Sequence, residues 1–163
     1  MHLTTARLIL RTVTMDDVEQ VALNWNLGGA PISREEAQDR VLWMLENHTQ
    51  NAPGRLTHLC LAMIDKEAQA FVGWCGLDHR DRTRPAPVLF YLLKASHWGK
   101  GLATEAARAV LDYAFGPLGL DRVDGGAAPE NLASCRVMEK IGMSYVGLNA
   151  EGGYSFRCDA PRR

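Results

Sequence analysis

Residues 92–106 have the sequence LLKASHWGKGLATEA, an apolar strand end followed by a turn and a helical pattern. The turn holds two glycines, Gly99 and Gly101, which let the backbone fold tightly and bring its N–H groups close to a ligand. The helix that starts near Leu102 leaves N–H donors and a partial positive charge in its first turn. The segment therefore predicts a site for a phosphate or diphosphate group, to which Lys100 can add a charge.

Two common phosphate-binding motifs do not match this turn. A P-loop requires Gly-x-x-x-x-Gly-Lys-Ser/Thr, but Lys94 stands at the first glycine position and Gly101 follows Lys100. A dinucleotide motif would have Gly or Ala where Thr104 stands, and it would follow the first strand of a parallel unit. A glycine turn without a ligand stays open as an alternative, because short glycine patterns are common.

A second informative segment is residues 131–143, NLASCRVMEKIGM. Its apolar residues recur at helical spacing, and Gly142 provides a stop at the C-terminal end. Asn131 and Ser134 are three residues apart, so they share one face at the helix start. Helix capping by Asn131 is the simplest interpretation of that residue alone.

The rest of the chain predicts an α+β fold, one mixed sheet with helices packed on it. Strands are expected at residues 7–13, 56–64, 70–77, 88–93, 122–124, 143–148 and 154–158. Helices are expected at residues 15–25, 33–48, 101–115 and 131–141. Three consecutive strands with short connections, at residues 56–93, indicate an antiparallel meander.

Composition excludes several classes of protein. The 163 residues carry 18 Lys and Arg against 19 Asp and Glu, a net charge of -1, so no basic surface favours nucleic acid. The four cysteines lie far apart and form no Cys or Cys/His cluster, so no metal site is expected. No signal peptide and no apolar run of about 20 residues is present, which predicts a soluble, cytoplasmic protein without a membrane partner.

Residues 98–106 and 130–143 together resemble the GCN5-related N-acetyltransferases (GNAT). Within them they resemble the branch that includes ribosomal-protein alanine N-acetyltransferases of the RimJ/RimL type. Residues 5–11, TARLILR, resemble the opening strand of that branch. The resemblance implies one domain over residues 1–163, with a mostly antiparallel sheet of about seven strands and about four helices on both faces.

The resemblance also implies acetyl-CoA as co-substrate and a set of contacts to it. Leu92 and Leu93 end the strand that pairs with the pantetheine arm, and Trp98 replaces an Arg or Gln of the family's diphosphate loop. Asn131 matches an asparagine that hydrogen-bonds the arm, and Ser134 matches a serine near the thiol, the candidate catalytic residue. The implied cofactor-binding residues are Leu92, Leu93, Trp98, Gly99, Lys100, Gly101, Leu102, Ala103, Thr104, Asn131 and Ser134.

The implied reaction is direct attack of a primary amine on the thioester in a ternary complex. Deprotonation at pH 7 costs a lysine amine roughly 4.6 kcal/mol and an α-amine only about 1 kcal/mol. The acceptor is therefore expected to be a peptide N-terminus or a small amine, for which a water relay suffices. Asp78 and His79 are base candidates, with a solvated loop as the alternative. A homodimer is compatible with these observations, and a non-catalytic acyl-CoA sensor is the alternative function.

Overall fold

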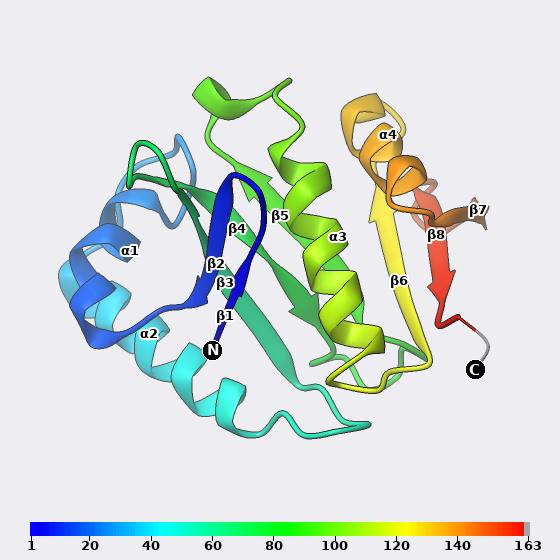
Figure 1. The fold of residues 1–163 in the computed structure, drawn as a ribbon, viewed down its shortest axis with the longest axis horizontal. Coiled ribbons are helices and arrows are strands. Elements are labelled where there is room, and N and C mark those ends of the chain that lie inside the picture. Colours follow the sequence, from blue (N-terminus) through cyan, green and yellow to red (C-terminus); the bar gives the residue numbers. More distant parts are fainter. Residues whose placement is uncertain (162–163) are drawn as a thin grey trace.

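The structure, a computed structural model, describes residues 1–161 and contains one eight-stranded sheet (Figure 1). The strands are β1 (His2–Thr4), β2 (Leu8–Thr12), β3 (His58–Asp65), β4 (Phe71–Asp78), β5 (Val88–Leu93), β6 (Arg122–Ala127), β7 (Ser144–Leu148) and β8 (Tyr154–Asp159). The sheet order is β1-β2-β3-β4-β5-β6-β8-β7, and only β5 and β6 pair in parallel. The predicted α+β class and mostly antiparallel sheet are confirmed, with β1 as a strand that the sequence patterns did not predict.

Helices cover both faces of the sheet, as predicted. They are α1 (Val18–Asn24), α2 (Arg34–Thr49), α3 (Leu102–Phe115) and α4 (Leu132–Lys140), with short 3-10 turns η1 (Met15–Asp17) and η2 (Ala95–His97). One apolar core lies between the sheet and the α3/α4 side, and a second lies between the sheet and the α1/α2 side. Side chains of β3 alternate between the two cores, since Leu59 and Leu61 lie in the first core and Ala62 lies in the second.

The sheet opens between β5 and β6. Only Val88 and Asp124 pair across these two strands, and the Asp124 N–H donates to the Pro87 carbonyl at 2.8 Å. Beyond this point the strands diverge, with α3 lying over the space between them (Figure 1). The remaining length of β5 therefore has a backbone edge that no strand of the described chain covers.

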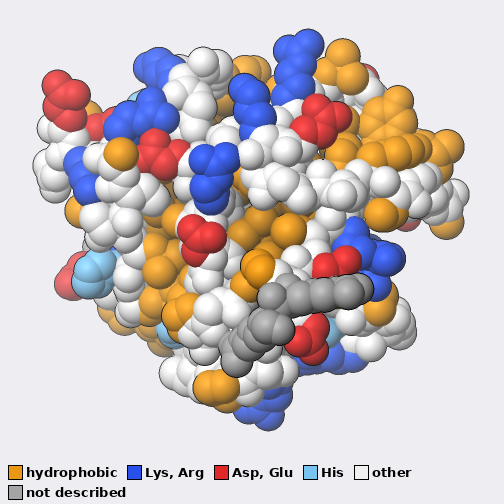
Figure 2. All heavy atoms as spheres, turned by 45° about the vertical axis from the view of Figure 1, so that its right-hand side comes forward, with side chains coloured by type: hydrophobic (Ala, Val, Ile, Leu, Met, Phe, Trp, Pro, Cys, Tyr) orange, Lys and Arg blue, Asp and Glu red, His pale blue; other side chains and the backbone are white. Residues whose placement is uncertain are grey.

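The last strand in the sheet order, β7, has an apolar outer surface. Its exposed side chains include Tyr145, Val146 and Leu148. Figure 2 brings this side of the molecule forward and shows hydrophobic side chains gathered there. An edge strand with exposed apolar residues can pair with another chain. The homodimer stays a prediction, and this edge is a surface that it could use.

Candidate active site

The glycine loop before α3 has the backbone geometry that an anion site needs. Gly99 and Gly101 have φ values of 73° and 77°, in the left-handed region that glycine adopts readily. The N–H groups of residues 99–104 donate no backbone hydrogen bond within residues 1–161, and the first such bond from α3 runs from Glu105 to the Gly101 carbonyl. A row of free donors at a helix N-terminus favours a phosphate group.

The Trp98 side chain contacts the end of β5, and its role in cofactor binding stays a prediction. Trp98 is 68% exposed, and its indole Nε1 donates to the Leu93 carbonyl at 2.9 Å. The side chain therefore ties the loop to the end of β5. Leu92 and Leu93 point to opposite faces of the sheet, since Leu92 lines a cavity on the α1/α2 face and Leu93 packs against the α3 core.

The start of α4 is held by both its cap and a contact from β5. The Asn131 Oδ1 accepts from the Ser134 N–H at 3.1 Å, so Asn131 is the N-cap, as its sequence position predicts. The Ser134 carbonyl accepts from the Tyr91 hydroxyl at 3.0 Å, a bond that crosses the opening from β5. Burial raises the pKa of Tyr91, which keeps the phenol protonated at neutral pH. The Ser134 hydroxyl itself makes no hydrogen bond to the residues that the structure describes.

A cavity of about 970 Å³ lies on the other face of the sheet, between β3, β4 and β5 and the helices α1 and α2. A smaller hollow of about 450 Å³ lies beside β6 and β8, and Arg84 and Val88 line both. The aromatic residues that line the larger cavity are Trp25, Trp43, His58, Trp74 and Phe90.

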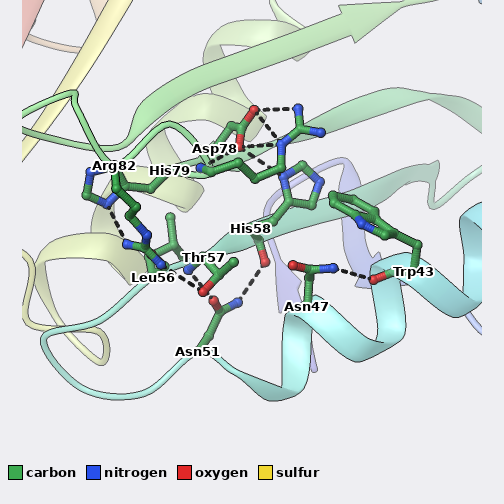
Figure 3. A network of polar contacts seen from close by, with 10 residues as sticks. Trp43, Asn47, Asn51, Leu56, Thr57, His58, Asp78, His79 and Arg82 are labelled. Carbon is green, nitrogen blue, oxygen red and sulfur yellow. Dashed lines mark hydrogen bonds and ion pairs between the residues drawn. The ribbon is translucent and has the colours of Figure 1, made fainter.

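His58 and Asp78 form a polar pair in the lining of this cavity, and Figure 3 shows the two side chains facing each other. The two residues are register partners on β3 and β4, and the His58 Nδ1 lies 3.5 Å from the Asp78 Oδ1. Burial lowers the pKa of His58, and this outweighs the opposing effect of Asp78. Burial disfavours the ionised form of Asp78, but hydrogen bonds from Arg80 outweigh it and lower the pKa of Asp78 to about 2. The site therefore holds a neutral imidazole beside a carboxylate.

His79, the other base candidate, lies in the loop after β4. Its Nε2 is 3.1 Å from the Arg84 carbonyl, and its Nδ1 is 3.2 Å from the Arg82 Nη1. Both ring nitrogens thus contact residues of the same loop, and Figure 3 shows the contact with Arg82. These contacts favour the solvated-loop interpretation for His79, whereas Asp78 lines the cavity.

Local sequence patterns did not indicate His58 or Tyr91 as site residues. His58 reaches Asp78 only through the β3–β4 register, and Tyr91 reaches Ser134 only because α4 lies against β5. Neither pairing has a local sequence signature. Within residues 1–161 no cluster of three potential metal ligands occurs, and no helix there is long and apolar enough to cross a membrane.

Comparison with known proteins gives the family. The sequence profile of the "Acetyltransferase (GNAT) domain" family matches residues 7–144. The uncharacterized N-acetyltransferase p20 of Bacillus licheniformis is 27% identical over 152 residues, 88% of this chain and 83% of p20.

Two solved structures share the fold. An acetyltransferase from Agrobacterium tumefaciens has a TM-score of 0.73 and 28% identity over 97% of this chain and 94% of its own. The ribosomal L7/L12 α-N-protein acetyltransferase RimL, in complex with coenzyme A, has a TM-score of 0.80 and 14% identity over 98% of both chains. The chain thus belongs to the GNAT family of acetyl-CoA-dependent acetyltransferases and has the fold of its RimJ/RimL-like members.

Proposed function

We propose that this enzyme, one acyltransferase domain over residues 1–163, moves the acetyl group of acetyl-CoA to a primary amine in a ternary complex. The observation that carries the proposal is that two binding regions meet at β5. The opening towards β6 lies along one edge of this strand, and the aromatic cavity lies over one of its faces through Val88, Phe90 and Leu92. An amine in the cavity is then adjacent to a thioester in the opening.

The chain offers separate groups for each part of the donor. The free N–H groups of residues 99–104 bind the diphosphate, with Lys100 adding a positive charge. The uncovered edge of β5 at Leu92 and Leu93 hydrogen-bonds the pantetheine arm. The Asn131 Oδ1 is used by the helix cap, which leaves the side-chain NH₂ to donate to that arm.

The reaction forms a C–N bond and breaks a C–S bond at one carbonyl carbon. The sulfur leaves with the electron pair as a thiolate, which is stable enough at a pKa of about 8.5 to need only modest help. The Ser134 hydroxyl donates a hydrogen bond to it. The amine proton passes to His58, which is neutral and lines the cavity, and the Asp78 carboxylate stabilises the imidazolium that forms.

A weakly basic amine suits this site. His58 has a lowered pKa, so it is a mild base, and a protein N-terminal α-amine needs only about 1 kcal/mol for deprotonation at pH 7. The RimL neighbour is named for α-N-protein acetylation. The hollow beside β6 and β8 offers room for the part of an acceptor that lies beyond its amine.

The test is release of free thiol from acetyl-CoA, followed with a panel of peptide N-termini, small amines and polyamines. We expect CoA release above the hydrolysis background with at least one primary amine, together with a product whose mass is higher by one acetyl group. If the protein binds CoA by calorimetry but acetylates none of these amines, catalysis is rejected in favour of a sensor.

A further inference from the structure

Part of the acceptor cavity is lined by flat rings that lie against one another, and the rest of its lining includes several charged residues. The ring centroids of Trp43 and His58 lie 4.8 Å apart, and those of His58 and Phe90 lie 5.9 Å apart in a stacked pair at 11°. Trp25 and Trp74 form another pair at 6.0 Å. The aromatic part of the lining favours burial of a planar apolar group.

Two of these rings already have a cation over them. The Arg40 guanidinium lies 4.5 Å from the Trp25 centroid, and that of Arg80 lies 5.2 Å from the Trp43 centroid. The charges of both are balanced by carboxylates, in the ion pairs Arg40–Glu36 and Arg80–Asp78. A second ammonium group of an acceptor would therefore meet arginines where it needs an open aromatic face. A second ammonium group would instead have to bind the carboxylates of the lining, and Glu36, Asp78 and Asp81 are already paired with arginines.

One row of residues connects the cavity with the opening of the sheet. His58, Asp78, Val88 and Asp124 are consecutive register partners across β3, β4, β5 and β6. This row leads from the aromatic lining to the single β5–β6 pair, where the sheet opens. An amine that reaches the opening near Val88 leaves its substituent over Phe90 and the rings behind it.

We propose that the acceptor is a primary amine joined by a short linker to an aromatic ring, such as an arylalkylamine or an aromatic N-terminal residue. This inference rests on the proposed function for the identity of the reacting group. The cavity volume of about 970 Å³ is sufficient for such a molecule.

The experiment compares 2-phenylethylamine, ethylamine and spermidine at equal concentrations. We expect kcat/KM for 2-phenylethylamine to exceed that for the other two by at least about tenfold, the effect of burying one phenyl group. Trp43→Leu removes one wall and should reduce this preference several-fold. Leu42→Ala, on the exposed side of α2, is the matched control and should leave the preference unchanged.

Equilibrium dialysis of the same amines with CoA present separates this inference from the proposed function. Binding of 2-phenylethylamine that Trp43→Leu weakens supports the cavity assignment even if no amine is acetylated. The inference is overturned if kcat/KM for ethylamine or spermidine equals or exceeds that for 2-phenylethylamine, or if 2-phenylethylamine does not bind.

A different observation concerns Arg7, which lies between β1 and β2. Glu105, in the first turn of α3, holds this residue with both carboxylate oxygens. Its Oε1 accepts from the Thr5 hydroxyl at 2.5 Å and from the Arg7 N–H at 2.7 Å, and its Oε2 accepts from the Arg7 Nε at 2.8 Å. The Arg7 Nη1 in turn donates to the Lys100 carbonyl at 2.8 Å.

This last bond fixes the direction of one peptide in the glycine loop. The Lys100–Gly101 peptide is trans, so its carbonyl and its N–H point in opposite directions. A guanidinium on the carbonyl therefore keeps the Gly101 N–H turned away from Arg7, and it also polarises the peptide and strengthens this donor. We infer that Arg7, oriented by Glu105, is a positioning residue for the diphosphate-binding loop.

The test uses two donors with the same thioester, acetyl-CoA and acetyl-pantetheine, which lacks the diphosphate. Arg7→Ala should raise KM for acetyl-CoA roughly tenfold, with little change in kcat, and leave kcat/KM for acetyl-pantetheine unchanged. Arg11→Ala removes a comparable ion pair, with Asp17, on the neighbouring strand and should affect neither donor.

The dissociation constants of CoA and pantetheine for the same variants give this comparison without turnover. An equal loss for both ligands in Arg7→Ala would mean that Arg7 only stabilises the fold. An unchanged affinity for CoA would also reject the positioning role.

Discussion

Ser134 illustrates how the backbone and the side chain of one residue can have separate tasks. Its N–H binds the Asn131 cap and its carbonyl accepts from Tyr91, while its hydroxyl stays free. Ser134→Ala should therefore keep the melting temperature of the parent. We expect kcat to fall by the equivalent of about 1–3 kcal/mol, the range for one lost polar contact.

Asn131→Ala is the stability reference for this prediction, compared by melting temperature because the same side chain donates to the pantetheine arm in the proposed function. It removes the cap and should lower the free energy of unfolding by about 1 kcal/mol. Measurement of kcat and melting temperature on both variants separates the two roles. A Ser134→Ala protein with a lower melting temperature and the parent kcat would make this serine structural.

Two histidines, the buried His58 and the half-buried His48, make stability depend on pH. Burial lowers the pKa of both His58 and His48 below the ordinary 6.5. The unfolded chain therefore binds more protons than the folded one below about pH 6.5, so this contribution is complete above that pH and decreases as pH falls through the folded pKa values. Asp78, with a pKa of about 2 against 3.8, keeps its contribution until pH drops below 3.8.

Urea denaturation at pH 8, 6.5 and 5 checks this expectation. The free energy of unfolding should decrease towards pH 5, by roughly 1.4 kcal/mol for each unit of lowered pKa that is crossed. His58→Gln should flatten the decrease, and His2→Gln, at an exposed position, should not. A parent protein equally stable at pH 8 and pH 5 would contradict the assignment.

Residues of the site differ in how far the sequence could reveal them. The left-handed conformation of Gly99 and Gly101 and the cap at Asn131 are local features that local patterns were sufficient to predict, whereas their contacts with CoA stay predictions. His58 and Tyr91 act through partners 20 and 43 residues away, and their contacts depend on strand register and helix docking. Those are set by the packing of the whole sheet.

At the scale of elements, the loop before α3 is where sequence and geometry agree best. Gly101 has a φ of 77°, and a Cβ there would lie 3.5 Å from the Arg7 Nη2. Gly101→Val should abolish detectable CoA binding, because it strains the loop and fills space next to the guanidinium.

Gly119→Val is the control for strain alone. Gly119 has a φ of 60° with no atom near its added Cβ, and it lies after α3. This variant should lose about 1 kcal/mol or more of stability and keep the parent affinity for CoA by calorimetry. Normal CoA binding by a folded Gly101→Val protein would reject the loop assignment.

The helices and most strands were predicted to within a few residues, because their patterns are local. The helix expected at residues 101–115 is α3, at Leu102–Phe115. β1 was not predicted, since His2–Thr4 is too short to show alternation and its pairing with β2 defines it. The cavity was not predicted either, because its walls come from α2, β3, β4 and β5 together with Trp25 and the loop after β4.

At the scale of the whole molecule, CoA should stabilise the fold. A ligand present at 100 times its dissociation constant adds roughly 2.7 kcal/mol to the free energy of unfolding. For a chain of this size we expect a rise of about 5–10 °C in melting temperature. Gly101→Val should show no rise, and the absence of a rise in the parent would reject CoA as a ligand.

The sheet consists of two parts, β1–β5 and β6–β8, which are joined only through the pair Val88 and Asp124. Within each part the strands are joined by continuous hydrogen-bonded ladders, whereas little backbone hydrogen bonding joins the two parts. Each part can therefore unfold locally without the other. Amide hydrogen exchange should then be faster in β6 and β8 than in β3 and β4. An extended pantetheine arm between β5 and β6 would act as a temporary ninth strand. In each catalytic cycle, donor binding would then connect the two parts of the sheet, and product release would separate them again.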